Sequence, residues 1–165
     1  MSLEEYKGVA IFAQQVDNKL SSIAFELIGK AHELASDLGT DVTAVVLGSN
    51  IANLADELGE YGADKVVVID DPALETYRTE PYAQALAAYI NEYKPEIMLV
   101  GATAIGRDLG PTVSARVQTG LTADCTSLEI GDFPLQAVAG REQKHNQLLM
   151  TRPAFGGNTI ATIAC

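Results

Sequence analysis

The fold is decided by residues 42–70, which run from one apolar segment through a helical pattern to a second apolar segment. The first segment is Val42-Thr43-Ala44-Val45-Val46-Leu47-Gly48 and the second is Lys65-Val66-Val67-Val68-Ile69-Asp70. Both are rich in β-branched residues, which predicts β-strands, and apolar residues spaced three and four apart over 50–58 predict a short helix between them. A strand, a helix and a strand form a βαβ unit with parallel pairing. Because the second strand is apolar throughout, we expect both of its faces to be covered.

The same alternation continues on both sides of this unit. An apolar run at residues 8–13 predicts a strand, and residues 23–38 predict a helix that ends at Gly39, a residue suited to a helix C-cap. A third helix is predicted over 80–93, with Tyr82, Leu86, Tyr89 and Ile90 facing inward, and a fourth strand over 96–101. The sequence therefore predicts a Rossmann-like α/β sandwich of three layers with a mostly parallel sheet.

After Gly101 the pattern changes. We expect a helix over 108–119 and then short strands over 121–130, 148–152 and 159–164, with an exposed polar loop at 140–147. No segment between the last two strands is long enough for a crossover helix, so they are predicted to be an antiparallel C-terminal extension of the sheet. We expect one domain over 1–165, with a parallel core over about 1–120 and a β extension over about 121–165.

The 165 residues carry a net charge of −11, and this charge is unevenly placed. Residues 1–96 hold 6 basic and 17 acidic side chains, whereas residues 97–165 hold 5 of each. Such acidity argues against nucleic-acid binding and against an anionic membrane surface. We interpret the neutral second half as the working part, although an undirected drift of surface charge would give the same pattern. No apolar stretch is long enough to span a membrane, and we do not expect the acidic N-terminus to be a signal peptide.

Few residues of the chain suit catalysis or metal binding. Cys125 and Cys165 form no disulfide framework, and His32 and His145 are too far apart in sequence to indicate a metal cluster. The chain contains no G-x-S-x-G, H-E-x-x-H or G-x-G-x-x-G motif. We therefore predict a cytoplasmic protein with no catalytic residue and no metal site of its own.

The first candidate motif is Gly101-Ala102-Thr103-Ala104-Ile105-Gly106-Arg107-Asp108-Leu109-Gly110-Pro111, which follows the fourth predicted strand and opens a helix. The carboxyl ends of parallel strands are the usual ligand position in such sheets, and helix N-termini favour anions. A phosphate-binding loop would continue with Lys and then Ser or Thr, whereas Arg107 and Asp108 stand here. Two interpretations stay open: a ligand loop, or a tight turn in which Asp108 caps the helix.

Two further motifs lie in the C-terminal part. Thr151-Arg152-Pro153-Ala154-Phe155-Gly156-Gly157-Asn158 contains a turn signal between two predicted strands, and Arg152 with Phe155 can hold a flavin or anchor a protein interface. In Thr119-Gly120-Leu121-Thr122-Ala123-Asp124-Cys125-Thr126, Asp124 is a lone carboxylate in a predicted apolar strand. We expect it to be hydrogen-bonded or paired with an arginine, and we expect Cys125 to be a small buried residue.

These three long motifs, in this order, closely resemble those of the α subunit of electron-transfer flavoprotein. The resemblance covers essentially the whole chain. It implies the N-terminal domain of that subunit, with an adenine-nucleotide-hydrolase-like α/β fold. It also implies that a FAD-binding domain follows in the natural chain. FAD is therefore expected in the full-length heterodimer, and no flavin is expected to bind this chain tightly by itself.

The resemblance implies an electron carrier rather than an enzyme. In that family, electrons pass from flavin dehydrogenases, such as the acyl-CoA dehydrogenases of fatty acid β-oxidation, to an acceptor such as a quinone oxidoreductase. This chain would pack on the β subunit, which holds AMP or a second FAD, and the domain alone can form a homodimer.

The resemblance also assigns the motif residues. The edge of the partner's flavin or nucleotide site, or the subunit interface, is assigned to Arg107, Arg152, Phe155, Gly156, Gly157 and Asn158. Structural or interface roles are assigned to Gly101, Gly106, Asp108, Gly110 and Asp124.

Two other functions compete with this one. A free-standing nucleotide-binding module, similar to universal stress proteins, would use the glycine-rich loop after the fourth strand to hold ATP, but Arg107 and Asp108 suit phosphates poorly. A hydrolase on the same fold would need a nucleophile or metal constellation that the sequence does not show.

Overall fold

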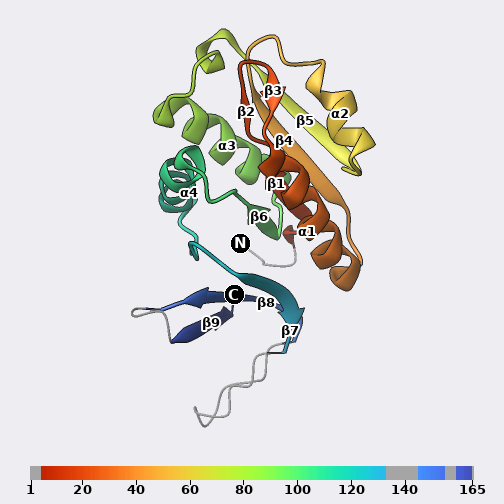
Figure 1. Ribbon diagram of the computed structural model, residues 1–165, viewed down its shortest axis with the longest axis vertical. Coiled ribbons are helices and arrows are strands. Elements are labelled where there is room, and N and C mark those ends of the chain that lie inside the picture. Colours follow the sequence, from red (N-terminus) through yellow and green to blue (C-terminus); the bar gives the residue numbers. More distant parts are fainter. Residues whose placement is uncertain (1–4, 133–144, 155–158, 165) are drawn as a thin grey trace. The chain divides into compact units, whose positions relative to one another are not determined.

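The computed structural model describes residues 5–132, 145–154 and 159–164. The chain divides into two compact units, Met1–Leu121 (unit 1) and Thr122–Cys165 (unit 2). Figure 1 shows the elements of both units. In the described part of the chain, no helix is long and apolar enough to cross a membrane.

Unit 1 is built on a four-stranded parallel sheet. Its strands are β1 (Val9–Phe12), β4 (Val42–Gly48), β5 (Lys65–Asp70) and β6 (Ile97–Leu99). They lie in the order β5-β4-β1-β6, and each neighbouring pair is parallel. The predicted parallel α/β fold is confirmed. Because β1 lies between β4 and β6, the chain winds outward from β1 in both directions.

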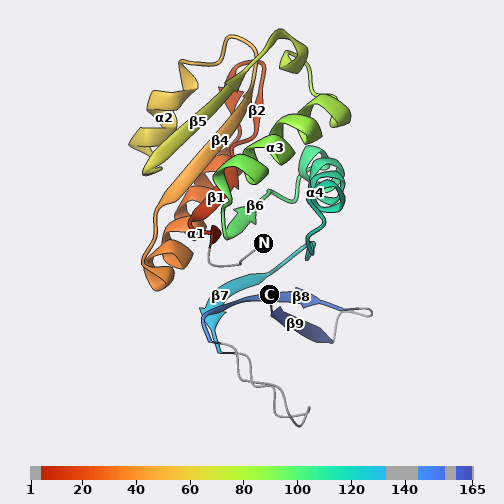
Figure 2. The same cartoon turned by 180° about the vertical axis from the view of Figure 1, so that it is seen from behind.

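Four helices cover the two faces of this sheet. They are α1 (Ser22–Leu38), α2 (Leu54–Glu60), α3 (Thr79–Tyr93) and α4 (Ala104–Val117). Helices α1 and α2 lie on one face, and α3 and α4 lie on the other (Figures 1 and 2). This arrangement confirms the three layers. Helix α1 ends at Gly39 with φ 65°, the left-handed conformation expected of a glycine C-cap.

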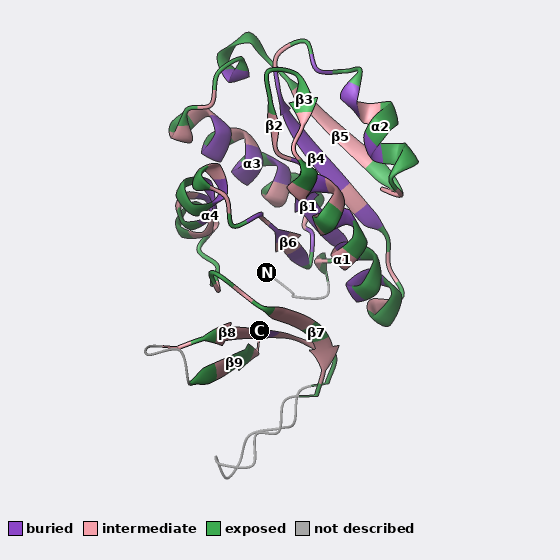
Figure 3. Ribbon diagram, viewed as in Figure 1, coloured by how far each residue is buried: buried purple, intermediate pink, exposed green. Residues whose placement is uncertain are grey.

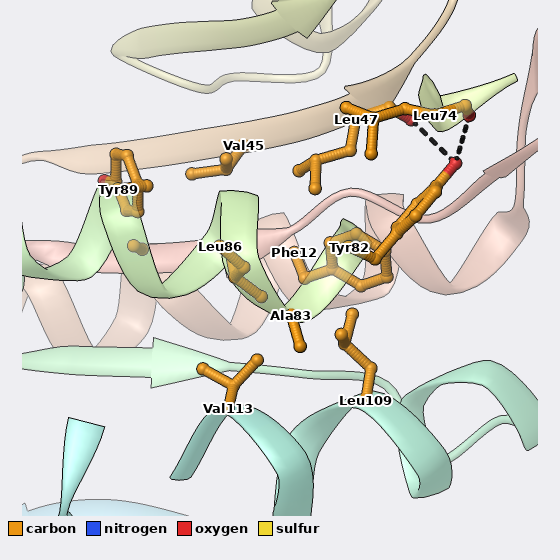
Figure 4. Close-up of a cluster of buried hydrophobic side chains, with 11 residues drawn as sticks. Phe12, Val45, Leu47, Leu74, Tyr82, Ala83, Leu86, Tyr89, Leu109 and Val113 are labelled. Carbon is orange, nitrogen blue, oxygen red and sulfur yellow. Dashed lines mark hydrogen bonds between the residues drawn. The ribbon is translucent and has the colours of Figure 1, made fainter. Parts of the chain in front are cut away.

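One cluster of the core lies between the sheet, α3 and α4 (Figure 4). Alternate residues of β1 and β4 face this side because side chains alternate along a strand. Tyr82, Leu86 and Tyr89 of α3 are buried, as predicted. Tyr82 keeps a polar partner there, because its hydroxyl donates to the carbonyl oxygen of Leu74 at 2.9 Å. The sheet contributes Ala10, Phe12, Val45 and Leu47, and α4 contributes Leu109 and Val113.

Several details of unit 1 differ from the sequence prediction. Strand β5 was expected to be covered on both faces, but its apolar residues are only half-buried. It lies at the edge of the sheet, so it has a neighbouring strand on one side only. Helix α2 begins at Leu54, later than expected. A small hairpin of β2 (Gln15–Val16) and β3 (Lys19–Leu20) was not predicted, and neither was the 3-10 turn η2 (Pro72–Leu74).

Unit 2 contains the strands β7 (Ser127–Gly131), β8 (Gln147–Pro153) and β9 (Ile160–Ala164). They pair in the order β7-β8-β9, and both pairs are antiparallel, as predicted. They form a sheet of their own instead of adding strands to the parallel sheet. Strand β7 begins at Ser127 and not at residue 121, since Asp124 has φ 55° and cannot continue a strand.

Candidate functional site

The first motif forms the loop between β6 and α4, at the carboxyl edge of the parallel sheet. Two of its glycines are required by close packing. A Cβ on Gly106 would lie 3.0 Å from the carbonyl carbon of Gly101 and closer still to its oxygen. A Cβ on Gly101 would lie 2.5 Å from Cγ1 of Ile23 in α1. The loop therefore folds tightly on itself and on α1, and a side chain at either position would force it open.

Helix α4 begins at Ala104, so the prediction of a start at Asp108 is wrong. Thr103 is the N-cap, and its Oγ1 accepts a hydrogen bond from the amide of Gly106 at 3.0 Å. Asp108 lies one turn inside the helix, so of the two open interpretations the one in which it caps the helix is wrong. The glycine at 106 suggested a loop, but here it stands within the first helical turn. The residue that could have predicted the start of α4 is Thr103, because threonine is a favoured N-cap residue.

The loops that follow β1 and β6 are joined by side chains. Thr103 Oγ1 donates to Oε1 of Gln14 at 2.6 Å. Next along the chain, Nε2 of Gln15 donates to the carbonyl oxygen of Leu47 at 3.0 Å, which ties this segment to the end of β4. The point between β1 and β6, where the strand order reverses, is the usual ligand crevice in doubly wound sheets. In this chain the polar groups of that crevice bind one another.

Asp108 connects α4 to the start of α3 and to the segment just before it. Its Oδ2 accepts hydrogen bonds from the Tyr77 hydroxyl at 2.6 Å and from Thr79 Oγ1 at 2.5 Å. Both bonds lower the pKa of Asp108 below its usual value, and the bond from Thr79 has the larger effect. Burial and the bond to Asp108 raise the pKa of Tyr77 to about 12. Asp108 therefore acts as a structural tie between helices within this chain. Sequence reasoning missed both of its partners.

The other predicted residues of α4 have different surroundings. Arg107 is exposed, and its Nε donates to the carbonyl oxygen of Ala102 at 3.2 Å, so part of the guanidinium folds back on the loop. Gly110 is buried, and a Cβ there would only touch Leu121 at 3.9 Å. Near the end of the helix, Arg116 Nη2 reaches both carboxylate oxygens of Glu80 at 2.8 Å, a second tie to α3.

In unit 2, the structure brings Asp124, Cys125 and Arg152 together. The amide of Thr126 donates to the carbonyl oxygen of Thr151 at 2.8 Å, which aligns the two C-terminal motifs. Burial raises the pKa of Cys125, while the Arg152 cation opposes this rise and the Asp124 carboxylate adds to it. Two expectations need correction. Asp124 lies in an exposed bend and not in an apolar strand, and Cys125 is half-buried, with its Sγ bonded to the Thr122 carbonyl oxygen at 3.4 Å. Phe155, Gly156, Gly157 and Asn158 lie outside the described residues.

The chemistry available to these residues is structural. Within residues 5–132, 145–154 and 159–164, no group of three or more His, Cys, Asp or Glu residues is arranged to hold a metal ion. The described motif residues mainly form caps, ties and turns. Together, the fold and the motifs define a Rossmann-like α/β domain with an additional antiparallel sheet. At the carboxyl edge of the parallel sheet, where such folds usually bind a ligand, side chains of the chain itself are hydrogen-bonded to one another.

Comparison with known proteins identifies the family. A family model described as "Electron transfer flavoprotein domain" matches residues 9–165, so the chain belongs to the electron transfer flavoprotein domain family. The chain is 48% identical over 165 residues to the electron transfer flavoprotein subunit alpha of Clostridium acetobutylicum, covering all of this chain and 46% of that protein. The subunit alpha of Megasphaera elsdenii is 46% identical over 165 residues, with the same coverage.

A third relative has a different name. The lactate dehydrogenase (NAD(+),ferredoxin) subunit LctC of Acetobacterium woodii is 45% identical over 158 residues, which are 96% of this chain and 35% of that protein. The chain spans at most about half the length of these relatives. The resemblance expected from the three motifs is confirmed.

Proposed function

We propose that this chain is the N-terminal domain of an electron transfer flavoprotein α subunit, which supports FAD-dependent electron transfer by packing on the β subunit. The observation that carries the proposal is the family match over residues 9–165, together with 48% identity to an α subunit over the full chain. The domain is an electron-carrier component, and the chemistry belongs to the flavin. Its cytoplasmic location stays a prediction.

FAD is the cofactor of the whole protein in this proposal. At the carboxyl edge of unit 1, the Gln14–Thr103 bond joins the loops after β1 and β6, and Gly101 packs closely on Ile23. We propose that these contacts disfavour a flavin at this edge. The same contacts disfavour the ATP-binding alternative. A flavin would therefore be held by other parts of the full-length protein, with this domain as a rigid support.

The motif residues fall into two groups. Structural or interface roles are proposed for Gly101, Gly106, Asp108 and Gly110, which lie in the loop before α4 or in α4 itself, and for Asp124, which lies in the bend before β7. The subunit interface and the edge of the partner's flavin or nucleotide site are proposed for Arg107, Arg152, Phe155, Gly156, Gly157 and Asn158. The half-buried Arg152 is the best test residue among them, since an arginine at a partly desolvated position is a typical interface anchor.

Electron donors and acceptors follow from the family. We propose flavin dehydrogenases, including acyl-CoA dehydrogenases of fatty acid β-oxidation, as donors, and a quinone oxidoreductase as an acceptor. The relatives' names differ in this respect, because one is named for an NAD- and ferredoxin-linked lactate dehydrogenase. The donor is therefore best identified by assay with several purified dehydrogenases.

Calorimetry with the purified β subunit from the same genome tests the proposal. The expected result is one-to-one binding, weakened about tenfold or more by Arg152→Ala, since an anchor arginine is worth more than about 1 kcal/mol. Arg78→Ala is the matched control, because Arg78 is an exposed arginine of unit 1 and should leave the affinity unchanged. Absence of binding, combined with micromolar binding of ATP by the chain alone, would instead support the nucleotide-binding module.

A further inference from the structure

Strand β5 leaves one edge of the parallel sheet without a partner strand. It pairs with β4 on one side, and no strand in the described part of the chain pairs with its other side. An exposed edge presents unpaired main-chain N–H and C=O groups, and proteins normally protect it with charges, proline, a bulge or a short strand. The opposite edge of the sheet has such protection, because β6 has only three residues. Strand β5 has six.

The centre of β5 is apolar and accessible. Residues 66–69 are Val-Val-Val-Ile, and their register with β4 is continuous, so no bulge interrupts the edge. All four are half-buried, whereas β4 beside them is almost entirely buried, as the colours of Figure 3 show. Charged side chains stand only at the two ends of the run, with Lys65 before it and Asp70 and Asp71 after it.

The hydrogen bonds to β4 show which main-chain groups of this edge are free. Asp71 is extended, with φ −150° and ψ 138°, and its amide donates to the carbonyl oxygen of Gly48 at 3.0 Å. The main-chain groups of successive strand residues point alternately to the two sides of the strand. Odd-numbered residues such as Asp71 therefore bond to β4, and the N–H and C=O groups of Val66, Val68 and Asp70 point outward.

A second copy of the chain fits these outward groups in an antiparallel pair. A two-fold axis perpendicular to the sheet brings the two β5 strands together with equal faces on the same side. Directly opposite residues of an antiparallel pair lie on one face, so an even-numbered residue must stand opposite an even-numbered residue. With Val68 opposite Val68 of the second copy, Val66 stands opposite Asp70 and bonds to it through the outward groups of both.

The two neighbouring registers are less favourable. A shift by two residues in one direction places Asp64 opposite Asp70 of the second copy, and like charges directly opposite are destabilising. A shift in the other direction places Pro72 opposite Val66, and proline has no N–H to donate. The register centred on Val68 avoids both defects.

The same register brings opposite charges together at both ends of the pair. Lys65 stands opposite Asp71 of the second copy, and the two-fold axis repeats this contact. Lys65 Nζ already bonds to Asp41 Oδ2 at 2.8 Å, but an ammonium group has three donors. Asp71 Oδ1 accepts from the amide of Ala73 at 2.8 Å, and no described residue donates to its Oδ2. The edge of β5 is therefore complementary in charge to a second copy of itself.

We propose that the outer edge of β5 is the surface by which two copies of this chain associate, as an antiparallel pair centred on Val68. The net charge of −11 opposes this association, but at physiological ionic strength charges more than about 8 Å apart are largely screened. Because the edge is small, we expect a dissociation constant on the order of 10–100 µM. At low-micromolar concentration one copy therefore meets one β subunit, and the inference does not depend on the proposed function.

The first test is a charge exchange, followed by sedimentation equilibrium of the chain from about 5 to 500 µM. Lys65→Glu sets a carboxylate opposite Asp71 and should weaken the association at least about tenfold. The double variant Lys65→Glu/Asp71→Lys restores opposite charges and should return it to within about threefold of the unchanged chain. Lys30→Glu is the matched control, because Lys30 of α1 is also ion-paired, with Glu33, and should change the association less than about twofold.

A cross-linking test reads the register directly and needs no charge change. In a chain with Cys125→Ser and Cys165→Ser, Val68→Cys should form a disulfide-linked dimer with oxidised glutathione. The reason is that opposite Cα atoms of a hydrogen-bonded antiparallel pair lie about 5.5 Å apart, within the range of a disulfide. Val66→Cys is the matched control, since its two copies are displaced by about 13 Å along the strands and should not be linked.

Three results would overturn the inference. The first is a chain that stays monomeric over the whole concentration range, and the second is a Val66→Cys chain that is linked as readily as the Val68→Cys chain. The third is protection of the amides of Val66, Val68 and Asp70 from hydrogen exchange only after the β subunit is added, because the edge would then belong to that subunit. The proposed function is tested separately, by binding of the β subunit at low-micromolar concentration.

Discussion

Substitution of Gly106 by alanine should destabilise the protein, although alanine is the better helix former. The site is buried within the first turn of α4, and the new Cβ would lie 3.0 Å from the carbonyl carbon of Gly101 and closer to its oxygen. Since this obstacle is main chain, either the loop or the start of the helix must move. Overpacking of this kind costs about 1–3 kcal/mol.

Two smaller contributions accompany the clash. Movement of residue 106 weakens its amide bond to Thr103 Oγ1, a capping contact typically worth about 1 kcal/mol. The higher helix propensity of alanine offsets this loss of stability by about 1 kcal/mol. The net expectation is a loss of about 1–3 kcal/mol in the free energy of unfolding.

The assay is urea unfolding followed by far-ultraviolet circular dichroism. Gly29→Ala is the matched control, because Gly29 lies exposed in the interior of α1 and a Cβ there meets no atom within 4 Å. This control should gain about 0.5–1 kcal/mol. If Gly106→Ala proved as stable as the unchanged protein while Gly29→Ala showed its gain, the close packing of the loop on α4 would be refuted.

Three further predictions concern unit 1. Leu86→Ala should lower the free energy of unfolding by about 2–5 kcal/mol in the same urea assay, because Leu86 is fully buried between the sheet and α4. Gly39→Ala should cost about 1 kcal/mol, since φ is 65° there although the space is open; a stabilised variant would contradict this. Asp108→Asn should be less stable than the wild type at pH 7. A carboxyl with a lowered pKa stabilises the fold at pH values above its ordinary pKa. The difference in stability between wild type and Asp108→Asn should therefore shrink as the pH falls through the lowered folded-state pKa of Asp108. A difference in stability that does not depend on pH would contradict the role of the carboxylate.

The parallel core could be predicted because its signals are local and repeated. Strands such as residues 42–48 are apolar and β-branched, and Tyr82, Leu86 and Tyr89 recur with the helical period, so both pattern and burial agree with the structure. The edge position of β5 could not be predicted in this way. An apolar run indicates a strand, but the number of neighbours on each side depends on the order of strands in the sheet.

The candidate site was less predictable because it depends on contacts between distant residues. Thr103 and Gln14 are 89 positions apart, yet their side chains are 2.6 Å apart. Tyr77 and Thr79 likewise reach Asp108 across about 30 residues, which turns an expected helix cap into a tie between helices. The β2–β3 hairpin was missed because its two-residue turn, Asp17-Asn18, adopts positive φ without a glycine.

The most direct test of the central claim is the sedimentation-equilibrium mass of an equimolar mixture of this chain and the β subunit. If the chain is a support domain of an electron transfer flavoprotein, the mixture should show a single species with the mass of one copy of each, colourless without added flavin. Two separate species, together with a chain that binds FAD tightly by itself, would contradict the account.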